Sequence, residues 1–325
     1  MAVTIKDIAR LAKVHHSTVV RVLNSTPTEK ISKDVSEKIL AIAKKIGYRK
    51  NVRASMFKRG AKDIGVFVGL KSESLCSNPL YQQIVSHLLV AAGRKGKRLV
   101  YCNLPPATGA DSIPEEIDDS LYSGLVVLGG DYPSYIDEFA GRIPVLQLFR
   151  VKPSKTIYQL VIDNDQASEL ILKYYQVHGI KRPLLLYSPD IGIVMEKVEN
   201  LLAASKKYKH AVKIEAHVLT GRDGEMLFSG EYDIKRKNFF TSYDSLLGFT
   251  GGTYRLYAEI IKHGIELPPG YPFIVYDNLP FYRQLFPELI AIGVDYAKLA
   301  ERILSFFELK EKNKINYMDV EMFTN

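Results

Sequence analysis

The side chains whose chemistry is easiest to interpret lie close together near the start of the chain. His16, Ser17, Thr18 and Arg21 fall within six positions of a segment whose apolar residues recur at helical spacing. On one face of a short helix, such groups can donate hydrogen bonds to phosphates and base edges, and a guanidinium can contact guanine through two donors. The grouping favours nucleic-acid binding over catalysis.

Other reactive residues form no catalytic or metal-binding pattern. The sequence has no G-x-S-x-G, G-x-G-x-x-G or Walker loop, so we expect neither enzyme activity nor a cofactor. His15 and His16 are adjacent, which is the wrong spacing for one metal ion on a helix, and no cysteine is near them. The acidic residues within 115–119 are interpreted as a solvated helix face.

Charge is distributed unequally along the chain. Residues 1–62 contain 15 Lys/Arg and 4 Asp/Glu, whereas the remaining 263 residues contain 29 and 32. A strongly positive head on a mildly acidic body is typical of a nucleic-acid-binding module joined to a domain with another ligand. Two cysteines and no apolar run near ~18 residues predict a cytoplasmic protein without a membrane span.

Three short helices are predicted in the head, over residues 5–13, 17–24 and 33–46. Thr4 and Asp7 have the spacing of a capping box at the start of the first helix. Two helices separated by a tight turn, with a third completing a small core, form the helix-turn-helix plan, whose second helix enters the major groove.

The stretch TIKDIARLAKVHHSTVVRVLN, followed by KISKDVSEKILAIAKKIGYRKN, resembles the headpiece of the LacI/GalR family of bacterial transcription regulators. The resemblance implies a DNA-binding headpiece over 1–49. It also implies a hinge helix over 50–62 that inserts an apolar side chain, here Phe57, into the minor groove. The alternative for Phe57 is a linker aromatic packed on the body. The DNA-contacting positions implied are Thr4, His15, His16, Ser17, Thr18, Arg21, Asn24, Asn51, Ala54, Phe57 and Lys58.

Two positions depart from the family's pattern. The family has a serine at the position of His15, where it caps the recognition helix and contacts phosphate, and another serine at the position of Val20. Two neutral phosphate contacts are therefore expected to be missing, with His15 and His16 able to supply others if protonated. Base choice is expected to depend on His16, Ser17 and Arg21.

After the head, short apolar strands alternate with amphipathic helices, which predicts an α/β body with parallel, doubly wound sheets. The resemblance implies a two-lobed, periplasmic-binding-protein-like body over 63–325. One lobe would span about 63–161 and 293–317, and the other about 162–292 and 318–325. Ligands of such folds lie between the lobes, beyond the carboxyl ends of the strands.

The cleft implied by the resemblance is less polar than the family's. Phe149 and Lys197 stand where the family has an aspartate and an arginine, and Phe249 replaces an asparagine. Three alternatives follow: a different ligand bound by stacking, a sugar in another pose, or a fold that serves only dimerisation. The candidate effector-binding residues are Asn78, Tyr81, Phe149, Lys197, Phe249, Thr250 and Asp277.

The resemblance implies a homodimeric, sequence-specific regulator that binds a pseudo-palindromic DNA operator. We expect a repressor of a carbohydrate-utilisation or related catabolic operon, controlled by a small molecule such as a sugar or sugar derivative. The alternative is a ligand-binding receptor of the same fold with a degenerate, non-specific DNA-binding head. An enzyme fused to a DNA-binding head is disfavoured because no nucleophile–base pair is visible.

Overall fold

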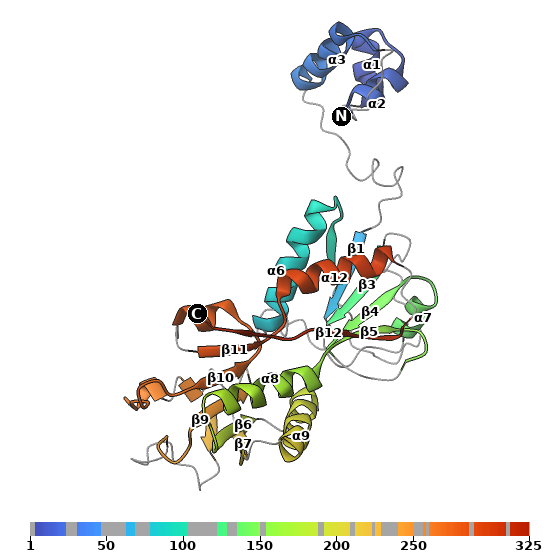
Figure 1. Cartoon of the computed structure of the whole chain (residues 1–325). Helices are drawn as coiled ribbons and strands as arrows, with labels where there is room; N and C mark the ends of the chain where they lie inside the picture. The colour runs from blue at the N-terminus through green and yellow to red at the C-terminus, as the bar shows by residue number, and fades with distance from the viewer. Residues whose placement is uncertain are drawn as a thin grey trace. The chain divides into compact units, whose positions relative to one another are not determined.

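A computed structural model of the chain forms two compact units, residues 1–61 and 62–325 (Figure 1). The structure describes residues 4–23, 31–46, 63–68, 79–102, 122–128, 135–149, 154–187, 192–208, 212–222, 225–228, 240–249, 256–257, 260–285, 289–309 and 313–324. Within these ranges no helix is long and apolar enough to cross a membrane.

The first unit consists of the helices α1 (Ile5–Ala12), α2 (His16–Leu23) and α3 (Lys33–Lys45). Ile8, Val19 and Ile39, one from each helix, have no exposed surface and form the centre of a small apolar core. The sequence prediction of three helices is confirmed, with ends that differ by at most one residue.

The predicted capping box at the start of α1 is also confirmed. The backbone N–H and hydroxyl of Thr4 both donate to the Asp7 carboxylate, at 2.9 and 2.7 Å. These two hydrogen bonds hold the pKa of Asp7 below its ordinary value. Ser32 caps α3 by accepting from the Val35 N–H at 3.4 Å.

The body contains two sheets. The first has the order β12-β5-β4-β3-β1-β2, and all of its strands are parallel. Its strands are β1 (Asp63–Val68), β2 (Leu99–Cys102), β3 (Tyr122–Leu128), β4 (Val145–Leu148), β5 (Tyr158–Ile162) and β12 (Ile315–Met318). Helices α6 (Pro79–Arg94) and α12 (Tyr296–Glu308) pack against each other beside this sheet, and α7 (Tyr135–Ala140) contacts β4.

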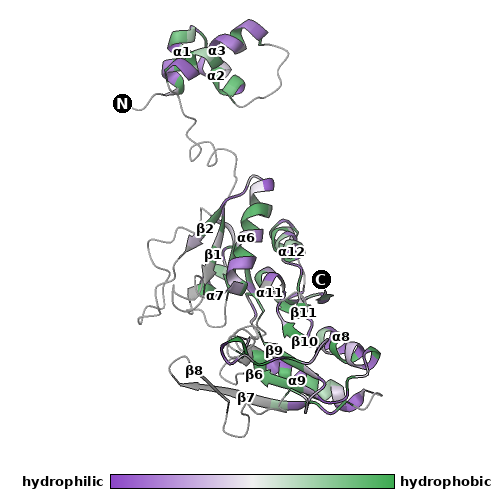
Figure 2. Ribbon diagram, turned by 90° about the vertical axis from the view of Figure 1, so that its left-hand side faces the viewer, coloured by the Kyte–Doolittle hydropathy of each residue, from purple (hydrophilic) through white to green (hydrophobic). Residues whose placement is uncertain are grey.

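The second sheet has the order β13-β11-β10-β9-β6-β7-β8 and is parallel except for β13 and β8. Its strands are β6 (Pro183–Tyr187), β7 (Glu215–Arg222), β8 (Glu225–Phe228), β9 (Ser245–Phe249), β10 (Phe273–Tyr276), β11 (Leu289–Gly293) and β13 (Glu321–Phe323). The accompanying helices are α8 (Asn164–Val177), α9 (Gly192–Lys207) and α11 (Pro280–Leu285). Helices α3 and α8 carry both polar and apolar residues along their lengths, as amphipathic helices do (Figure 2).

The chain passes between the two sheets three times: from β5 into α8, from β11 into α12, and from β12 into β13. Two of these crossing segments are joined by a hydrogen bond from the Asp163 N–H to the Met318 carbonyl at 3.1 Å. The predicted parallel α/β body is confirmed. The end of the chain contributes two short strands, β12 and β13, one to each sheet.

Gly293, at the end of β11, comes close to the backbone that follows β10. A Cβ atom at this position would lie 2.8 Å from the Asn278 nitrogen. We therefore expect Gly293→Ala to lower the free energy of unfolding, measured by urea denaturation, by about 1–3 kcal/mol. Gly93→Ala in α6 is the control, since nothing lies within 4 Å of its added Cβ. That variant should gain about 0.5–1 kcal/mol, and a Gly293→Ala protein as stable as the control would refute the close contact.

Candidate DNA-binding surface and ligand pocket

Helix α2 presents a polar face to solvent. His15, His16 and Arg21 are exposed, while Val19, on the side of the helix opposite Arg21, is fully buried in the core of the head. Ser17 and Thr18 are half-buried at the start of the helix. The burial of Val19 therefore fixes which side of the helix is available to DNA.

Other predicted DNA-contacting residues differ in how far the structure describes them. The Thr4 hydroxyl donates to Asp7, so its proton is engaged in the capping box and not free for a phosphate. Five predicted positions lie outside the described residues: Asn24, Asn51, Ala54, Phe57 and Lys58.

His15 caps the recognition helix itself. The Ser17 N–H donates to His15 Nδ1 at 3.4 Å, and Ser17 Oγ lies 2.8 Å from the same nitrogen. A ring nitrogen that accepts from an N–H cannot itself donate, so this arrangement leaves Nε2 as the nitrogen of the ring that can face a phosphate. The imidazole thus replaces the family's capping serine, and its Nε2–H is the group it can offer to a phosphate.

This capping role predicts how His15 variants behave. His15→Ala removes the acceptor, so we expect the free energy of unfolding of the head to fall by about 1 kcal/mol. His15→Ser restores a serine cap and should recover most of that stability. Hydrogen exchange of the α2 amides in the full chain measures both changes. Equal protection of these amides in the alanine and serine variants would show that His15 is not the cap.

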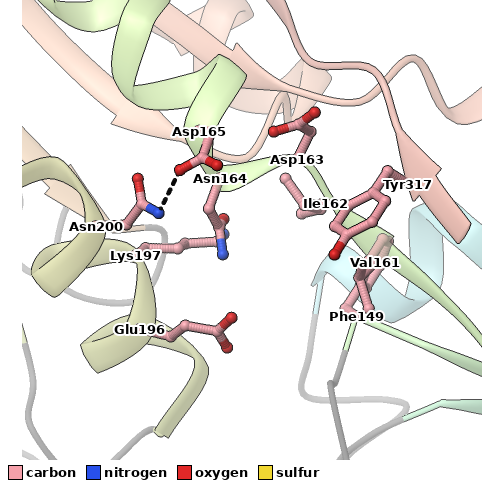
Figure 3. Close-up of a pocket in the computed structure, with 10 residues that line it drawn as sticks. All are labelled: Phe149, Val161, Ile162, Asp163, Asn164, Asp165, Glu196, Lys197, Asn200 and Tyr317. Atoms are coloured by element: carbon pink, nitrogen blue, oxygen red, sulfur yellow. Dashed lines mark hydrogen bonds between the residues drawn. The ribbon is translucent and has the colours of Figure 1, made fainter. Parts of the chain in front are cut away.

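The body contains a pocket of about 240 Å³ between the two sheets (Figure 3). Apolar and aromatic residues from the first sheet line one wall: Phe149, Val161, Ile162 and Tyr317. Residues at the start of α8 and on α9 line the other: Asp163, Asn164, Asp165, Glu196, Lys197 and Asn200. One wall is apolar and aromatic, and the facing wall is polar.

Two residues near the carboxyl ends of strands have a strained backbone. Phe149 follows β4 with a φ of 64°, and Asp277 follows β10 with a φ of 77°. Left-handed conformations of this kind cost a non-glycine residue about 1–3 kcal/mol and are concentrated at ligand sites. Their N–H groups are held by the carbonyls of Leu160 and Ile292, at 2.8 and 2.7 Å.

Lys197 and Asp277 form a buried ion pair beside the pocket. Lys197 Nζ lies 3.6 Å from Asp277 Oδ1, and the two side chains are 6% and 14% exposed. The same ammonium lies 4.8 Å from the centroid of the Tyr276 ring. Burial, followed by the charge of Asp277, raises the pKa of Tyr81 on α6 and of Tyr296 on α12. Residues from both lobes therefore lie close to this ion pair.

The predicted effector-binding residues do not all share one surface. Phe149 and Lys197 line the pocket, whereas Asp277 is the ion-pair partner of Lys197 and its charge acts on Tyr81. Phe249 is only 6% exposed and stacks on Tyr276, with ring centroids 4.8 Å apart. The ring of Phe249 is thus packed within the core of the second lobe. Asn78 and Thr250 lie outside the described residues.

The sequence analysis did not select most of the polar pocket wall. Asp163, Asn164 and Asp165 directly follow strand β5, and a polar cluster at the carboxyl end of a strand was the signal that could have identified them. Glu196 and Asn200 lie on α9, a helix that was not predicted. The described residues contain no group of acidic, histidine or cysteine side chains able to hold a metal ion.

Residues 4–51 match the model of the lacI family of bacterial regulatory proteins. A relative along nearly the whole chain is the probable HTH-type transcriptional repressor ExuR of Bacillus subtilis strain 168. It is 23% identical over 329 residues, which cover 95% of this chain and 93% of the relative. The head of this chain therefore matches the lacI family, and the chain along nearly its whole length is similar to a repressor with such a head. The resemblance seen in the headpiece is confirmed.

Solved structures share the fold of this chain. The Lac repressor dimer bound to operator and the anti-inducer ONPF has a TM-score of 0.69 and 17% identity, over 99% of this chain and 98% of that one. A periplasmic binding protein/LacI transcriptional regulator from Alkaliphilus metalliredigens QYMF, complexed with D-xylulofuranose, has a TM-score of 0.56 and 18% identity. That match covers 81% of this chain and 97% of the other. The predicted periplasmic-binding-protein-like fold is confirmed.

Proposed function

We propose that this LacI/GalR-family regulator is a DNA-binding transcriptional repressor controlled by a small molecule bound between the two lobes of its body. The observation that carries the proposal is the presence of a lacI-type headpiece and a two-sheet body in one chain. A repressor relative matches it over 95% of the chain's length. The charge and fold of the head support DNA binding, and the pocket between the two sheets of the body supports the binding of a small molecule.

We propose that α2 enters the major groove and reads base edges through His16, Ser17 and Arg21. Thr18 and the Nε2–H of His15 would contact phosphates from the same end of the helix. Asn24, Asn51, Ala54, Phe57 and Lys58 are proposed to extend the contact along the DNA, with Phe57 as the minor-groove wedge. The head occupies about residues 1–49 and the hinge about 50–62 in this proposal.

The effector is proposed to bind in the pocket, where it would contact both lobes at once. Its contacts would favour one angle between the lobes and so change the population able to bind the operator. A ligand can shift this equilibrium only by its difference in affinity for the two arrangements. The D-xylulofuranose complex of one structural neighbour supports a carbohydrate-related ligand and a target operon of carbohydrate utilisation.

A homodimer on a pseudo-palindromic operator is part of the proposal, supported by the dimeric Lac repressor of the same fold. Leu89 and Val90 on α6 and Tyr101 on the edge strand β2 are exposed apolar side chains that a second copy could cover. Contact with the chromosome implies a cytoplasmic location.

Selection of genomic fragments by the purified protein tests the proposal. At ~150 mM salt, non-specific binding is suppressed, so a regulator should enrich fragments that share one pseudo-palindrome. Adding metabolite fractions should raise or lower this enrichment. Binding that fades uniformly as salt rises, with no enriched sequence under any addition, would contradict the proposal and favour a receptor with a non-specific head.

A further inference from the structure

The pocket's polar wall carries more negative than positive charge. It contains three carboxylates, on Asp163, Asp165 and Glu196, and the single ammonium of Lys197 (Figure 3). The ammonium lies 3.6 Å from Asp277 Oδ1, so its charge is already neutralised by a residue behind the wall. Within the described part of the chain, the pocket therefore offers an entering ligand a negative surface.

The helix N-terminus in the wall does not reverse this charge. A helix N-terminus normally attracts an anion. At the start of α8, Asp163 already serves as the cap by accepting from the Gln166 N–H at 2.9 Å, and Asp165 lies in the first turn. An anionic ligand would meet these two carboxylates where it would need donors, and like charges across an interface are strongly unfavourable.

Hydrogen-bond acceptors also outnumber donors in this wall. The Asn200 amide nitrogen donates to Asp165 at 2.8 Å, and its Oδ1 accepts from the Ser168 hydroxyl at 2.8 Å. The Oδ1 atom of Asn164 is buried without a hydrogen-bond partner among the described residues. Glu196 is exposed at the pocket and has no ion-pair partner in the described part of the chain. A ligand that matches this wall must bring donors.

The opposite wall suits the rest of such a ligand. Phe149 and Tyr317 present aromatic side chains from the first lobe. Aromatic faces bind the apolar surface of a small molecule and also attract a cation. A volume of about 240 Å³ accommodates a compact molecule the size of a monosaccharide or a short diamine.

We infer that the effector of this regulator is a small organic cation, a protonated amine, whose ammonium group binds Glu196 and Asp165 while its body packs on Phe149 and Tyr317. The inference rests on the proposed function in taking the occupant of this pocket as the effector. The inference excludes phosphorylated or carboxylated sugars as the effector, because they would place a negative charge against three carboxylates.

Matched sets of compounds that differ only in charge test the inference on the full-length protein. The probes are glucosamine, glucose and glucuronate; galactosamine, galactose and galacturonate; and putrescine, 1,4-butanediol and succinate. Thermal unfolding of the body is recorded with each, followed by titration calorimetry for compounds that raise Tm. In at least one set the amine should raise Tm, and its neutral and anionic partners should not.

Two variants then test which carboxylate binds the ammonium group of the ligand. Glu196→Gln should weaken binding of the stabilising amine about 5-fold. Glu199→Gln, which removes an exposed carboxylate from the same helix outside the pocket lining, should leave it unchanged. Stabilisation by a neutral or anionic member without its amine partner would overturn the inference, as would the absence of stabilisation in every set or an equal effect of the two variants. Operator affinity, measured with each compound, tests the proposed function separately. If an anionic or neutral sugar alters operator affinity, the inference about the charge of the effector is wrong but the proposed function is supported.

Discussion

Replacing Arg21 by alanine is expected to lower operator affinity by about 2–6 kcal/mol, because each subunit of a dimer would lose one bidentate guanine contact worth ~1–3 kcal/mol. This corresponds to roughly 30- to 20,000-fold in Kd. Arg21 is exposed on the face of α2 opposite the buried Val19, so its removal should leave the fold of the head intact. Fluorescence anisotropy with the selected operator and a scrambled duplex measures the change.

Arg10→Ala provides the matched control for charge. Arg10 is exposed on α1 and pairs with Asp7 at 3.3 Å, so its loss removes the same charge from the head without removing a base contact. The control should lower affinity for both duplexes similarly and keep the preference for the operator. If the Arg21→Ala variant discriminates between the two duplexes as well as the Arg10→Ala variant does, α2 is not the reading helix.

Replacing Lys197 by methionine is expected to destabilise the body by about 3 kcal/mol, because Asp277 would become a buried charge without its partner. Asp277→Asn should cost a similar amount for the converse reason. The double variant should lose much less than the sum of the two, since neither charge then remains buried. Urea denaturation followed by tyrosine fluorescence and circular dichroism measures these free energies of unfolding.

A surface ion pair of this chain is the control for the comparison of the Lys197 and Asp277 single and double variants. Lys95 Nζ lies 3.0 Å from Glu308 Oε2, with side chains 31% and 43% exposed. Lys95→Met should therefore cost less than about 1 kcal/mol. If the decreases in the free energy of unfolding of the two single variants simply add in the double variant, the two residues do not stabilise each other.

The head could be predicted from sequence because its structure is determined locally. Capping residues such as Thr4 and Ser32 and apolar residues at helical spacing set its three helices to within one residue. The cap of α2 could not be predicted in the same way. An imidazole caps a helix only when its rotamer returns Nδ1 to the backbone two residues on, and that geometry is visible only in the structure.

The body was predicted well where its strands are continuous apolar runs, and poorly elsewhere. Strands β4, β6 and β10 are short apolar runs because each is buried on both faces, and such runs predict strands. The hairpin β7–β8 contains polar residues at many positions and pairs antiparallel at the sheet edge, so no apolar run marked it. Helix α9 was also not predicted, and with it Glu196 and Asn200 of the wall that faces Phe149.

Individual site residues depended on packing that sequence similarity does not determine. Phe249 occupies a position where the family has a ligand-binding side chain, but its ring is more favourably buried against Tyr276. Lys197 lines the pocket and pairs with Asp277, and that ion pair could not be predicted from the sequence. The character of the pocket therefore followed from tertiary contacts.

The measurement that tests the central claim most directly compares affinity for the enriched pseudo-palindrome with affinity for a scrambled duplex of the same length and composition, at ~150 mM salt. A sequence-specific regulator should bind the first at least about 1,000-fold more tightly. A ratio near one, with both affinities falling equally as salt rises, would contradict the account, because binding would then depend on the charge of the head alone.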